Sequence, residues 1–564
     1  MRGGFDAIVV GSGFGGAVTA CRLAERGRRV LVLERGRRWR PADYPRAPGD
    51  AWIWDHKRPE RDNGWMELRW FRRMGVAQGA GVGGGSLIFA NVVVDATPGT
   101  FERGWPSEIT AGAMARYYER VAGMLCVQPL PSNQATARYR LLEEAALKSG
   151  FSNRFRPLPL AVTFDPEWHY GLDDPFSGRH TKIWTNEHGQ LQGTCVHCGN
   201  CDIGCQVRAK NTLDLNYLAR AEQHGAEIRP LHVVTSLAPE AGGYRVHFAR
   251  LEDGTQVAGS EAAPVVVLAA GSLGSTELLL RCRDAHGSLP GVSQHLGRGW
   301  SSNADFLTPA TYRDRAISPT RGPTITCALD FLDGAEGEQF FIEDGGFPDM
   351  LHNIAEPMNA RGRRTTLLVA AQHAADRASA IHRTVRQTMA FARAGRQWNL
   401  PWRSALQSIA RLAGQDDPLR GTMPWFAQGI DAGDGVLYLA GNRRGRRELA
   451  MRWNIRRSRT VIEAIVAMHV RLSRATGGRA RVPISWSLMR QLVTPHPLGG
   501  CNMGTTPANG VVDHRGEVFG YPGLFVADGA IVPRAIGLNP SKTIAALAER
   551  IADLMFEPRG RARS

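Results

Sequence analysis

Long apolar runs are missing from this sequence of 564 residues. No stretch reaches the roughly 18 consecutive apolar residues that a membrane-spanning helix needs. The chain starts with MRGGFDAIVVGSG and enters an apolar strand without a charged, then apolar, leader segment. We therefore expect a cytoplasmic protein, and the one membrane association left open is a peripheral one.

Lysine is scarce, with five among the 69 Lys and Arg residues, although the formal net charge is +16. The basic residues are scattered along the chain, and neither zinc-finger spacing nor a base-stacking motif accompanies them. Nucleic-acid-binding proteins gather such charge on one face or arm. We expect no nucleic-acid partner, and leave residues 361–364, 443–447 and the tail from 559 as candidate docking points for an acidic partner.

Cysteine is also scarce, with nine residues, which is too few for a disulfide scaffold in a chain of this size. The content of 43% hydrophobic and 22% charged residues is that of a globular protein. Cores stop growing at roughly 250 to 300 residues, so the length predicts two or more domains.

A glycine-rich turn lies near the start of the chain. Residues 5–10 (FDAIVV) are typical of a buried parallel strand, and GSGFGG at 11–16 leads into an apolar helical pattern. A second strand, RVLVL, ends at Glu34, 18 residues beyond Gly16. In a dinucleotide site Gly11 permits the tight turn, Gly13 lets the backbone approach a pyrophosphate, Gly16 packs the helix, and the acid binds ribose hydroxyls.

The segment after Glu34 favours FAD over NAD. Glu34-Arg35-Gly36 continues into a long irregular stretch instead of another strand and helix. Residues 79–85 then place five glycines in seven positions, before the apolar sequence LIFANVVV. Such a segment is suited to lie close against a flat or charged group, whereas the alternative is a flexible linker.

Several motifs occur together in a fixed order along the chain. They are GSGFGG with Glu34-Arg35-Gly36, GVGGGSLIFAN, VVVLAAGSLGST (265–276), LGRGWSSNAD (296–305), HPLGGC (496–501) and GLNPSKTIAALAER (537–550). In this order they resemble the glucose-methanol-choline (GMC) flavoprotein oxidoreductases, in particular the bacterial branch that contains cholesterol oxidases. The resemblance is weak across about residues 310–480, where the substrate pocket would lie.

The resemblance implies an α/β fold, α+β overall. A Rossmann-like FAD-binding domain would comprise residues 1–100, 205–305 and 490–564. A discontinuous substrate-binding domain, built on a mixed or antiparallel sheet with helices, would comprise residues 101–204 and 306–489. It also implies that an alcohol is oxidised as its carbinol hydrogen passes as hydride to the flavin.

The expected FAD contacts are spread over the motifs. They are Gly11, Gly13, Phe14, Gly15, Gly16, Glu34, Arg35, Gly36, Gly81, Val82, Gly83, Gly84, Ser86, Asn91, Val234, Ala270, Gly271, Asp528, Gly529, Asn539, Pro540 and Thr543. Pro540 and Thr543 open a helix whose N-terminus could stabilise the reduced flavin. No histidine lies in residues 79–95, where some relatives attach the flavin, so we expect non-covalent FAD.

His496 is the leading candidate for a catalytic base. Two prolines and two glycines surround it in PHPLGG, and it matches the family's active-site histidine. Asn539 matches a second family position, where an amide can hold the substrate oxygen but is a poor proton acceptor. His496 is thus the strong base of the pair, in keeping with removal of the hydroxyl proton.

Glu343 is a third catalytic candidate, at the end of the apolar sequence QFFIE. Behind apolar residues its carboxyl would be desolvated with a raised pKa, as an acid–base group requires. The alternative is a carboxylate at a strand end that faces solvent. The residues do not decide between the two.

Four cysteines fall within eleven residues, Cys195, Cys198, Cys201 and Cys205. Their CxxCxxCxxxC spacing is that of bacterial ferredoxins, with Gln206 where those proteins carry proline. The interpretations are an iron–sulfur cluster, a zinc site, and free thiols or a local disulfide. A cluster would let electrons leave the flavin one at a time, which would favour a dehydrogenase over an oxidase.

Residues 378–412 read as basic amphipathic helices, compatible with a lid, an interfacial anchor or a surface helix pair. The favoured function is oxidation of an alcohol, of sterol or terpenoid type, with oxygen or an external electron acceptor. One alternative is a sugar or other alcohol dehydrogenase that relays electrons through an iron–sulfur cluster. The alternative of another class is a non-catalytic flavin or iron–sulfur electron carrier or binding protein.

Overall fold

The structure is a computed structural model of the chain. It describes residues 4–46, 50, 52–348, 420–441, 445, 447–487 and 490–555. The basic helices that the sequence predicts in residues 378–412 lie outside these ranges. Within the described ranges, no helix has the length and apolar character needed to cross a membrane.

The first sheet is parallel and has five strands in the order β10-β2-β1-β14-β23. Its strands are β1 (Ala7–Val10), β2 (Val30–Leu33), β10 (Glu227–Arg229), β14 (Val265–Leu268) and β23 (Leu524–Val526). Every residue of β1 and β2 is buried, as apolar strands covered on both faces must be. The strands come from stretches of chain that are far apart in sequence.

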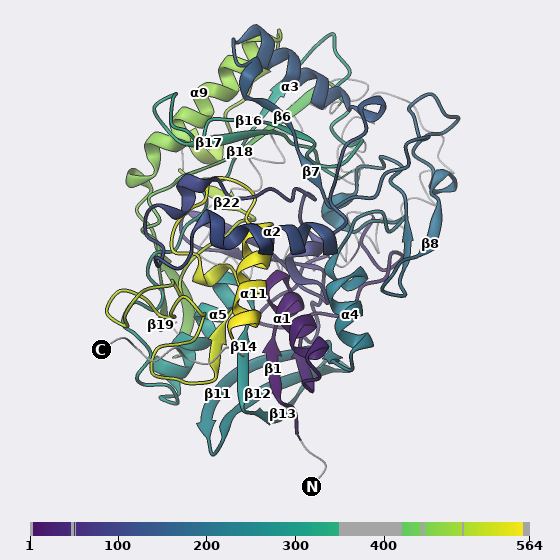
Figure 1. Cartoon of the computed structure of the whole chain (residues 1–564). Coiled ribbons are helices and arrows are strands. Elements are labelled where there is room, and N and C mark those ends of the chain that lie inside the picture. Colours follow the sequence, from purple (N-terminus) through teal and green to yellow (C-terminus); the bar gives the residue numbers. More distant parts are fainter. Residues whose placement is uncertain are drawn as a thin grey trace, which may run out of the picture.

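Helices and a second sheet pack against this parallel sheet (Figure 1). The helix α1 (Phe14–Glu25) contacts β1, β2 and β14, and lies between α4 (Tyr217–Gln223) and α11 (Ser541–Leu554). The antiparallel strands β11 (His232–Glu240), β12 (Gly243–Glu252) and β13 (Thr255–Ala263) also contact the parallel strands. The central strands β1 and β2 are thereby closed off from solvent, whereas the edge strand β10 is partly exposed.

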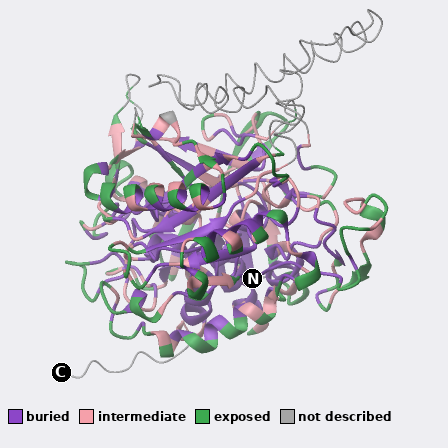
Figure 2. Ribbon diagram, turned by 90° about the horizontal axis from the view of Figure 1, so that it is seen from above, coloured by how far each residue is buried: buried purple, intermediate pink, exposed green. Residues whose placement is uncertain are grey.

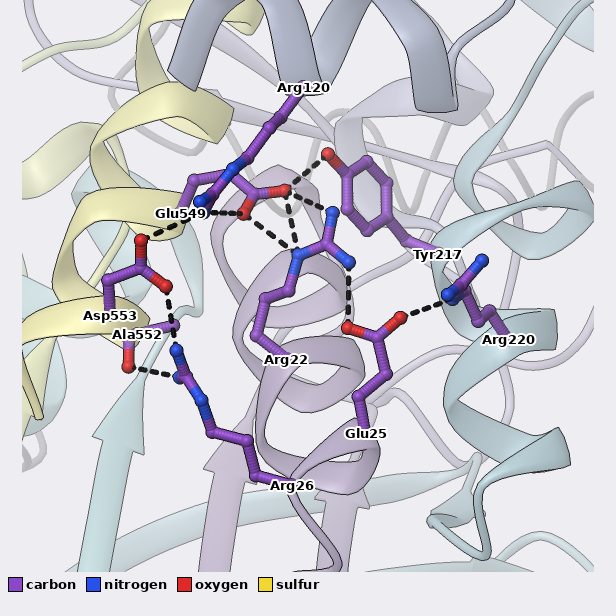
Figure 3. A network of polar contacts seen from close by, with 9 residues as sticks. All are labelled: Arg22, Glu25, Arg26, Arg120, Tyr217, Arg220, Glu549, Ala552 and Asp553. Atoms are coloured by element: carbon purple, nitrogen blue, oxygen red, sulfur yellow. Dashed lines mark hydrogen bonds and ion pairs between the residues drawn. The ribbon is translucent and has the colours of Figure 1, made fainter. Parts of the chain in front are cut away.

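A network of ion pairs joins the helices around α1 (Figure 3). The guanidinium of Arg22 donates to both carboxylate oxygens of Glu549 on α11, at 2.7 to 3.0 Å. The Tyr217 hydroxyl of α4 donates to the same carboxylate at 2.7 Å. The Glu549 side chain is fully buried, and a buried carboxylate requires a partner charge and hydrogen bonds of the kind that Arg22 and Tyr217 supply. The first and last helices of the fold are tied together in this way.

The second large sheet has six strands in the order β21-β15-β18-β17-β16-β6, and every pair is antiparallel. Its strands are β6 (Phe155–Pro157), β15 (Phe306–Thr311), β16 (Cys327–Asp330), β17 (Phe340–Asp344), β18 (Thr422–Gly429) and β21 (Arg479–Ala480). The helices α3 (Ala137–Lys148) and α9 (Arg459–Ala475) lie beside it at the top of Figure 1. The predicted fold class is confirmed, with the antiparallel form of the second sheet.

One face of the six-stranded sheet packs on helices. Trp425 donates from its indole to Ser473 of α9 at 2.8 Å, and Asp344, opposite it on β17, pairs with Arg138 of α3 at 3.6 Å. Residues directly opposite in antiparallel strands point to the same face, and the next pair points to the other. Phe426 and Glu343, the neighbouring pair, therefore face away from the helices.

A small sheet connects the two halves. The strand β22 (Leu492–Thr494) is parallel to β4 (Met74–Gly79), which is antiparallel to β3 (Met66–Trp70). Because β4 leads into the glycine-rich segment and β22 leads to His496, these two features are brought to the same region. The remaining elements are α2 (Ala111–Met124), α5 (Gly271–Leu280), α10 (Ile484–Ser487), β5 (Gln128–Pro129), β7 (Pro159–Leu160), β8 (Ile183–Thr185), β9 (Leu191–Gly193), β19 (Val436–Gly441), β20 (Arg447–Arg452), a π-helical turn (Arg281–Ala285) and short 3-10 turns.

The two large sheets share one buried interior, and exposed residues lie mainly on the outer faces of helices and on loops (Figure 2). The hydrophobic core runs through both sheets without a break. The domain boundaries expected from the sequence stay a prediction.

Candidate active site

A cavity of about 1310 Å³ lies between the two halves of the fold. Pockets for a single drug-sized ligand measure roughly 300 to 1,000 Å³, so this cavity has room for a cofactor and a substrate. Its lining includes these predicted site residues: Gly11, Gly13, Phe14, Gly15, Glu34, Arg35, Gly84, Val234, Ala270, Gly271, His496, Asp528, Gly529, Asn539 and Pro540. The structure thus brings together motifs from both ends of the chain.

The remaining predicted residues do not line the cavity. They are Gly16, Gly36, Gly81, Val82, Gly83, Ser86, Asn91, Glu343 and Thr543. Thr543 is buried in α11, where its hydroxyl lies 3.0 Å from that of Tyr118. Asn91 is fully buried, and neither polar atom of its amide has a hydrogen-bond partner among the described residues. Their predicted contacts with FAD stay untested.

The first glycine-rich turn is held by close backbone packing. Gly11 has φ +96°, and a Cβ there would lie 2.4 Å from the Ala269 carbonyl oxygen. A Cβ on Gly15 would lie 1.8 Å from the Ala527 carbonyl oxygen at the end of β23. Gly13 differs, because no protein atom would come closer than 3.8 Å to its Cβ. The space beside Gly13 opens on the cavity, as the predicted approach to a pyrophosphate requires.

Glu34 connects the two turns that border this part of the cavity. One carboxylate oxygen accepts hydrogen bonds from the Ser12 amide at 3.0 Å and the Ser12 hydroxyl at 2.7 Å. The other accepts from the Gly36 amide at 2.9 Å. Glu34 lines the cavity and is only 4% exposed, so it orders the turn as well as facing the expected ribose position.

The second glycine-rich segment is packed and is not a flexible linker. A Cβ on Gly84 would lie 2.5 Å from the Gly13 Cα, so the two glycine turns touch. The Ser86 hydroxyl donates to the Gly83 carbonyl at 2.7 Å and accepts from the Leu213 amide at 3.1 Å. Both hydrogen bonds of the Ser86 hydroxyl are therefore made to the protein backbone, where they hold the glycine-rich segment in place.

Asp528 closes the end of the parallel sheet. Its carboxylate accepts hydrogen bonds from the amides of Gly271 and Ala530, both at 2.8 Å, and from the Ser275 hydroxyl at 2.5 Å. Burial raises the pKa of Asp528 to about 6 despite these bonds. The residue ties β23 to the start of α5 at the cavity wall.

His496 faces the cavity and is held by a buried carboxylate. Its Nδ1 lies 2.8 Å from Asp305, and its own amide donates to the Thr494 hydroxyl at 2.9 Å. The Thr494 hydroxyl in turn donates to the second oxygen of Asp305. A carboxylate partner makes Nδ1 the donor, which leaves Nε2 with a lone pair.

Asp305 was not singled out from the sequence. It ends the segment LGRGWSSNAD, and its side chain is fully buried. Burial raises its pKa, although His496 and Thr494 oppose the shift. One sign of its role was present in the sequence, because Asp305 is the last residue of this motif and directly precedes strand β15. Only the fold shows that it meets a histidine 191 positions away.

Glu343 is fully buried, so the alternative of a solvent-facing carboxylate is wrong. It accepts a hydrogen bond from Gln428 at 2.9 Å, while its other oxygen has no partner among the described residues. Burial raises its pKa to about 8, and the nearby amides of Gln428 and Asn539 only partly oppose this. Asn539 itself lines the cavity, and its amide oxygen has no partner within the described chain.

The cysteine-rich segment does not support the predicted metal site. In the part of the chain that the structure describes, no three His, Cys, Asp or Glu side chains are grouped so that they could hold a metal ion. Cys195, Cys198, Cys201 and Cys205 are all free thiols. They surround a cavity of about 10 Å³, scarcely the space of one water molecule and far too small for an iron–sulfur cluster.

Burial determines the protonation of two of these thiols. It raises the pKa of Cys198 to about 12 and that of Cys195 well above its usual value. The Cys195 and Cys205 sulfurs accept hydrogen bonds from the amides of His197 and Ala209. The segment forms tight turns in which Cys195 is a small buried side chain and the other three thiols are partly buried.

The cavity fits FAD by three features of the described residues. The backbone at Gly13 leaves open space, Glu34 faces the nucleotide end, and Asn539 offers an unpaired amide oxygen at the other end. Buried polar atoms without partners are unusual in proteins and mark positions where a bound group can complete the hydrogen bonding.

Comparison with known proteins gives two family matches. Residues 438–548 match the C-terminal model described as GMC oxidoreductase, and residues 9–41 match a NAD(P)-binding Rossmann-like domain. Among curated proteins, the chain is 30% identical to a cholesterol oxidase of Mycobacterium tuberculosis over 98% of this chain and 91% of that protein. It is 27% identical to a cholesterol oxidase of Acinetobacter baumannii, over 97% of this chain and 93% of that protein.

More distant similarities agree on the fold. A long-chain-alcohol oxidase of Arabidopsis thaliana is 23% identical over 98% of this chain and 67% of that protein. Among solved structures, a formate oxidase of Aspergillus oryzae superimposes with a TM-score of 0.60 at 13% identity, covering 98% of both chains. A pyridoxine 4-oxidase from Mesorbium loti gives 0.58 at 15% identity, over 99% of this chain and 100% of that one.

Proposed function

The chain belongs to the GMC oxidoreductase family, and from that premise we propose that it oxidises an apolar alcohol of sterol or terpenoid type to a carbonyl compound. As a member it is a FAD-dependent oxidoreductase that acts on CH–OH donors. The observation that carries the proposal is the pairing of His496 with the buried Asp305 at the cavity wall.

His496 removes the proton of the substrate hydroxyl in this proposal. Because Asp305 holds Nδ1 as the donor, Nε2 is the acceptor, and it takes the proton as the carbinol hydrogen leaves as hydride. The charge that then forms on the imidazole is stabilised by the Asp305 carboxylate. Bound FAD supplies the acceptor for the hydride.

Two further side chains complete the polar end of the site. Asn539 lines the cavity and holds the substrate oxygen through its amide. Glu343, with a pKa of about 8, remains protonated at neutral pH and orients Asn539 from behind. An uncharged carboxyl there avoids a second negative charge near Asp305, which lowers the cost of burying both groups.

An apolar substrate is supported by the rest of the lining. Apolar side chains that border the cavity include Ile88, Phe89, Ile203, Leu307, Ile325 and Phe426. They can pack against an apolar substrate but offer no hydrogen-bond partners for the several hydroxyls of a sugar. The names of the cholesterol oxidases and the long-chain-alcohol oxidase agree with an apolar alcohol.

The predicted alternatives receive less support. A relay of electrons through an iron–sulfur cluster needs a metal site, and the cysteines form none within the described residues. A non-catalytic flavin protein would have no need of an oriented histidine and carboxylate at the cavity. The acceptor of the electrons, oxygen or an external molecule, is left open.

Anaerobic flavin reduction tests the proposal. The purified protein is expected to show flavin absorbance that bleaches on addition of a sterol, a terpenoid alcohol or a long-chain alcohol, and that persists with glucose. The control is the corresponding ketone or aldehyde, which has no hydride to give. A protein that takes up no FAD, or that is bleached by sugars alone, would contradict the proposal.

A further inference from the structure

The cysteine-rich segment contributes a carboxylate to the active-site cavity. Asp202 lies in the short turn Cys201–Ile203 and lines the same cavity as His496. We propose that Asp202 accepts a hydrogen bond from a second hydroxyl of the substrate, remote from the reacting one, so that the substrate class is apolar alcohols with a distal hydroxyl. The inference rests on the proposed function.

The contacts of Asp202 leave one oxygen for a ligand. The Thr324 hydroxyl donates to its Oδ1 at 3.1 Å. No hydrogen bond to Oδ2 is found among the described residues, and the side chain keeps part of its surface accessible although protein surrounds it. Such partial access inside the fold is what a side chain on a cavity wall shows. A substrate hydroxyl there would replace water as the donor.

The position of Asp202 places it away from the reacting end. His496 faces Phe426 on β18, with ring centroids 6.2 Å apart. Asp202 contacts Thr324, three residues before β16, and β17 lies between β18 and β16. Neighbouring strands are about 4.8 Å apart, so the two polar ends are separated by on the order of 10 Å across the sheet.

The cavity lining around Asp202 includes the apolar Ile203 and Ile325. A carboxylate in such surroundings discriminates strongly, because a bound molecule without a donor leaves its oxygen unpaired. A substrate that fills this cavity is therefore expected to be apolar along its length and polar at both ends.

The charges around Asp202 favour a neutral donor over a cation. Lys210 is buried and donates to the Cys201 carbonyl at 2.7 Å. Burial raises the pKa of Asp202 to about 6, and the positive charges of Lys210 and Arg138 oppose that shift. An ammonium group on the substrate would be repelled by these charges. A hydroxyl makes the hydrogen bond without that repulsion.

Matched substrates test the inference in the holoenzyme. Anaerobic flavin reduction is measured with α,ω-alkanediols and with 1-alkanols of the same chain lengths. At the chain lengths that bridge the two ends, the diol should exceed the alkanol in kcat/KM by roughly 10- to 100-fold, the scale of a hydrogen bond to a charged group. The gain should appear in the half-saturating concentration and not in the limiting rate.

Variants assign the preference to Asp202. In Asp202→Leu the diol should lose its advantage, whereas Asp202→Asn should keep part of it, since an amide oxygen still accepts a hydrogen bond. Asp173→Leu is the matched control, because the Asp173 side chain is 95% exposed in the same part of the chain. Thermal unfolding of each variant checks that it folds.

The outcomes separate the two proposals. Reduction by alkanols without a diol preference at any chain length would overturn this inference and leave the proposed function standing. A diol preference that survives in Asp202→Leu would also overturn it. If neither alkanols, diols nor sterols bleach the flavin, the proposed function fails and the inference falls with it.

Discussion

The two walls of the cavity are built in different ways. The wall of the Rossmann-like half is largely backbone, in which Gly13 and Gly84 lie against each other and leave space for a ligand. The wall of the other half consists of side chains, such as Phe426 and His496, from segments that meet only in the fold. A wall of backbone atoms can bind a cofactor that many proteins share, whereas the side chains of the other wall determine the reaction and the substrate.

His496→Ala should give the largest effect, because it should slow the reaction without loss of the cofactor. We expect flavin reduction by an apolar alcohol to slow by roughly 10² to 10⁴, the contribution of a general base, while the protein keeps its FAD. Stopped-flow absorbance measures the rate, and the flavin-to-protein ratio measures the cofactor. The exposed His224→Ala is the control. If the variant lost FAD as well as activity, cofactor binding and the reaction would not be divided between the two walls.

Glu343→Gln tests the charge of the side-chain wall. The raised pKa, about 8, means that the folded protein keeps a proton that the unfolded chain releases above its ordinary pKa near 4.5. Stability from this group is present below pH 4.5 and is lost as pH rises toward 8, by at most about 1.4 kcal/mol per pH unit.

The glutamine variant cannot ionise, so its free energy of unfolding should lack this decline. Urea unfolding at several pH values measures the difference between the two proteins, which should amount to a few kcal/mol across the window. The same substitution at the exposed Glu119 on α2 should leave the pH dependence as it is. Parallel curves for the protein and Glu343→Gln would show that Glu343 is ionised in the fold.

The backbone wall is tested by two glycines of the same turn, Gly13 and Gly15. In Gly15→Ala the new Cβ would lie 1.8 Å from a carbonyl oxygen, so we expect a loss of about 3 kcal/mol or more in the free energy of unfolding. In Gly13→Ala the Cβ has 3.8 Å of clearance, so the apoprotein should keep its stability and bind FAD more weakly. Denaturant unfolding and a FAD fluorescence titration distinguish them. Equal destabilisation would remove the proposed ligand role of Gly13.

The sequence predicted the backbone wall because its cause is local. The spacing of Gly11, Gly13 and Gly16 between a strand and a helix fixes a turn whatever the rest of the chain does. The fold class followed from such patterns and from the resemblance. The contact of Gly84 with Gly13 needed the fold, because it joins two turns that are 71 positions apart.

The side-chain wall and the cysteine-rich segment could not be predicted to the same depth. Spacing alone indicated a metal site at Cys195–Cys205, but in the described part of the chain no His, Cys, Asp and Glu side chains are grouped to hold a metal, and the space among the four thiols is too small for a cluster. For Glu343 the sequence left two interpretations, and only the packing of β17 decides that the carboxyl is buried. Asp305 was missed because its meaning depends on a partner from another strand.

Asp305→Asn gives the smallest of these effects and the finest test of the side-chain wall. Asp305 acts through His496, so removing its charge should slow the limiting rate of flavin reduction by about 10- to 100-fold, less than loss of the base itself. The alcohol concentration for half-maximal rate should stay unchanged, because Asp305 is buried behind the histidine and does not line the cavity. Thr494→Val is the matched control, since it removes the Thr494 hydroxyl, with its bonds to Asp305 and to the His496 amide, but leaves the bond between the Asp305 carboxylate and His496 Nδ1. If Asp305 had only a structural role, both variants would show the same fall in melting temperature. The limiting rate and the half-saturating alcohol concentration would then change together.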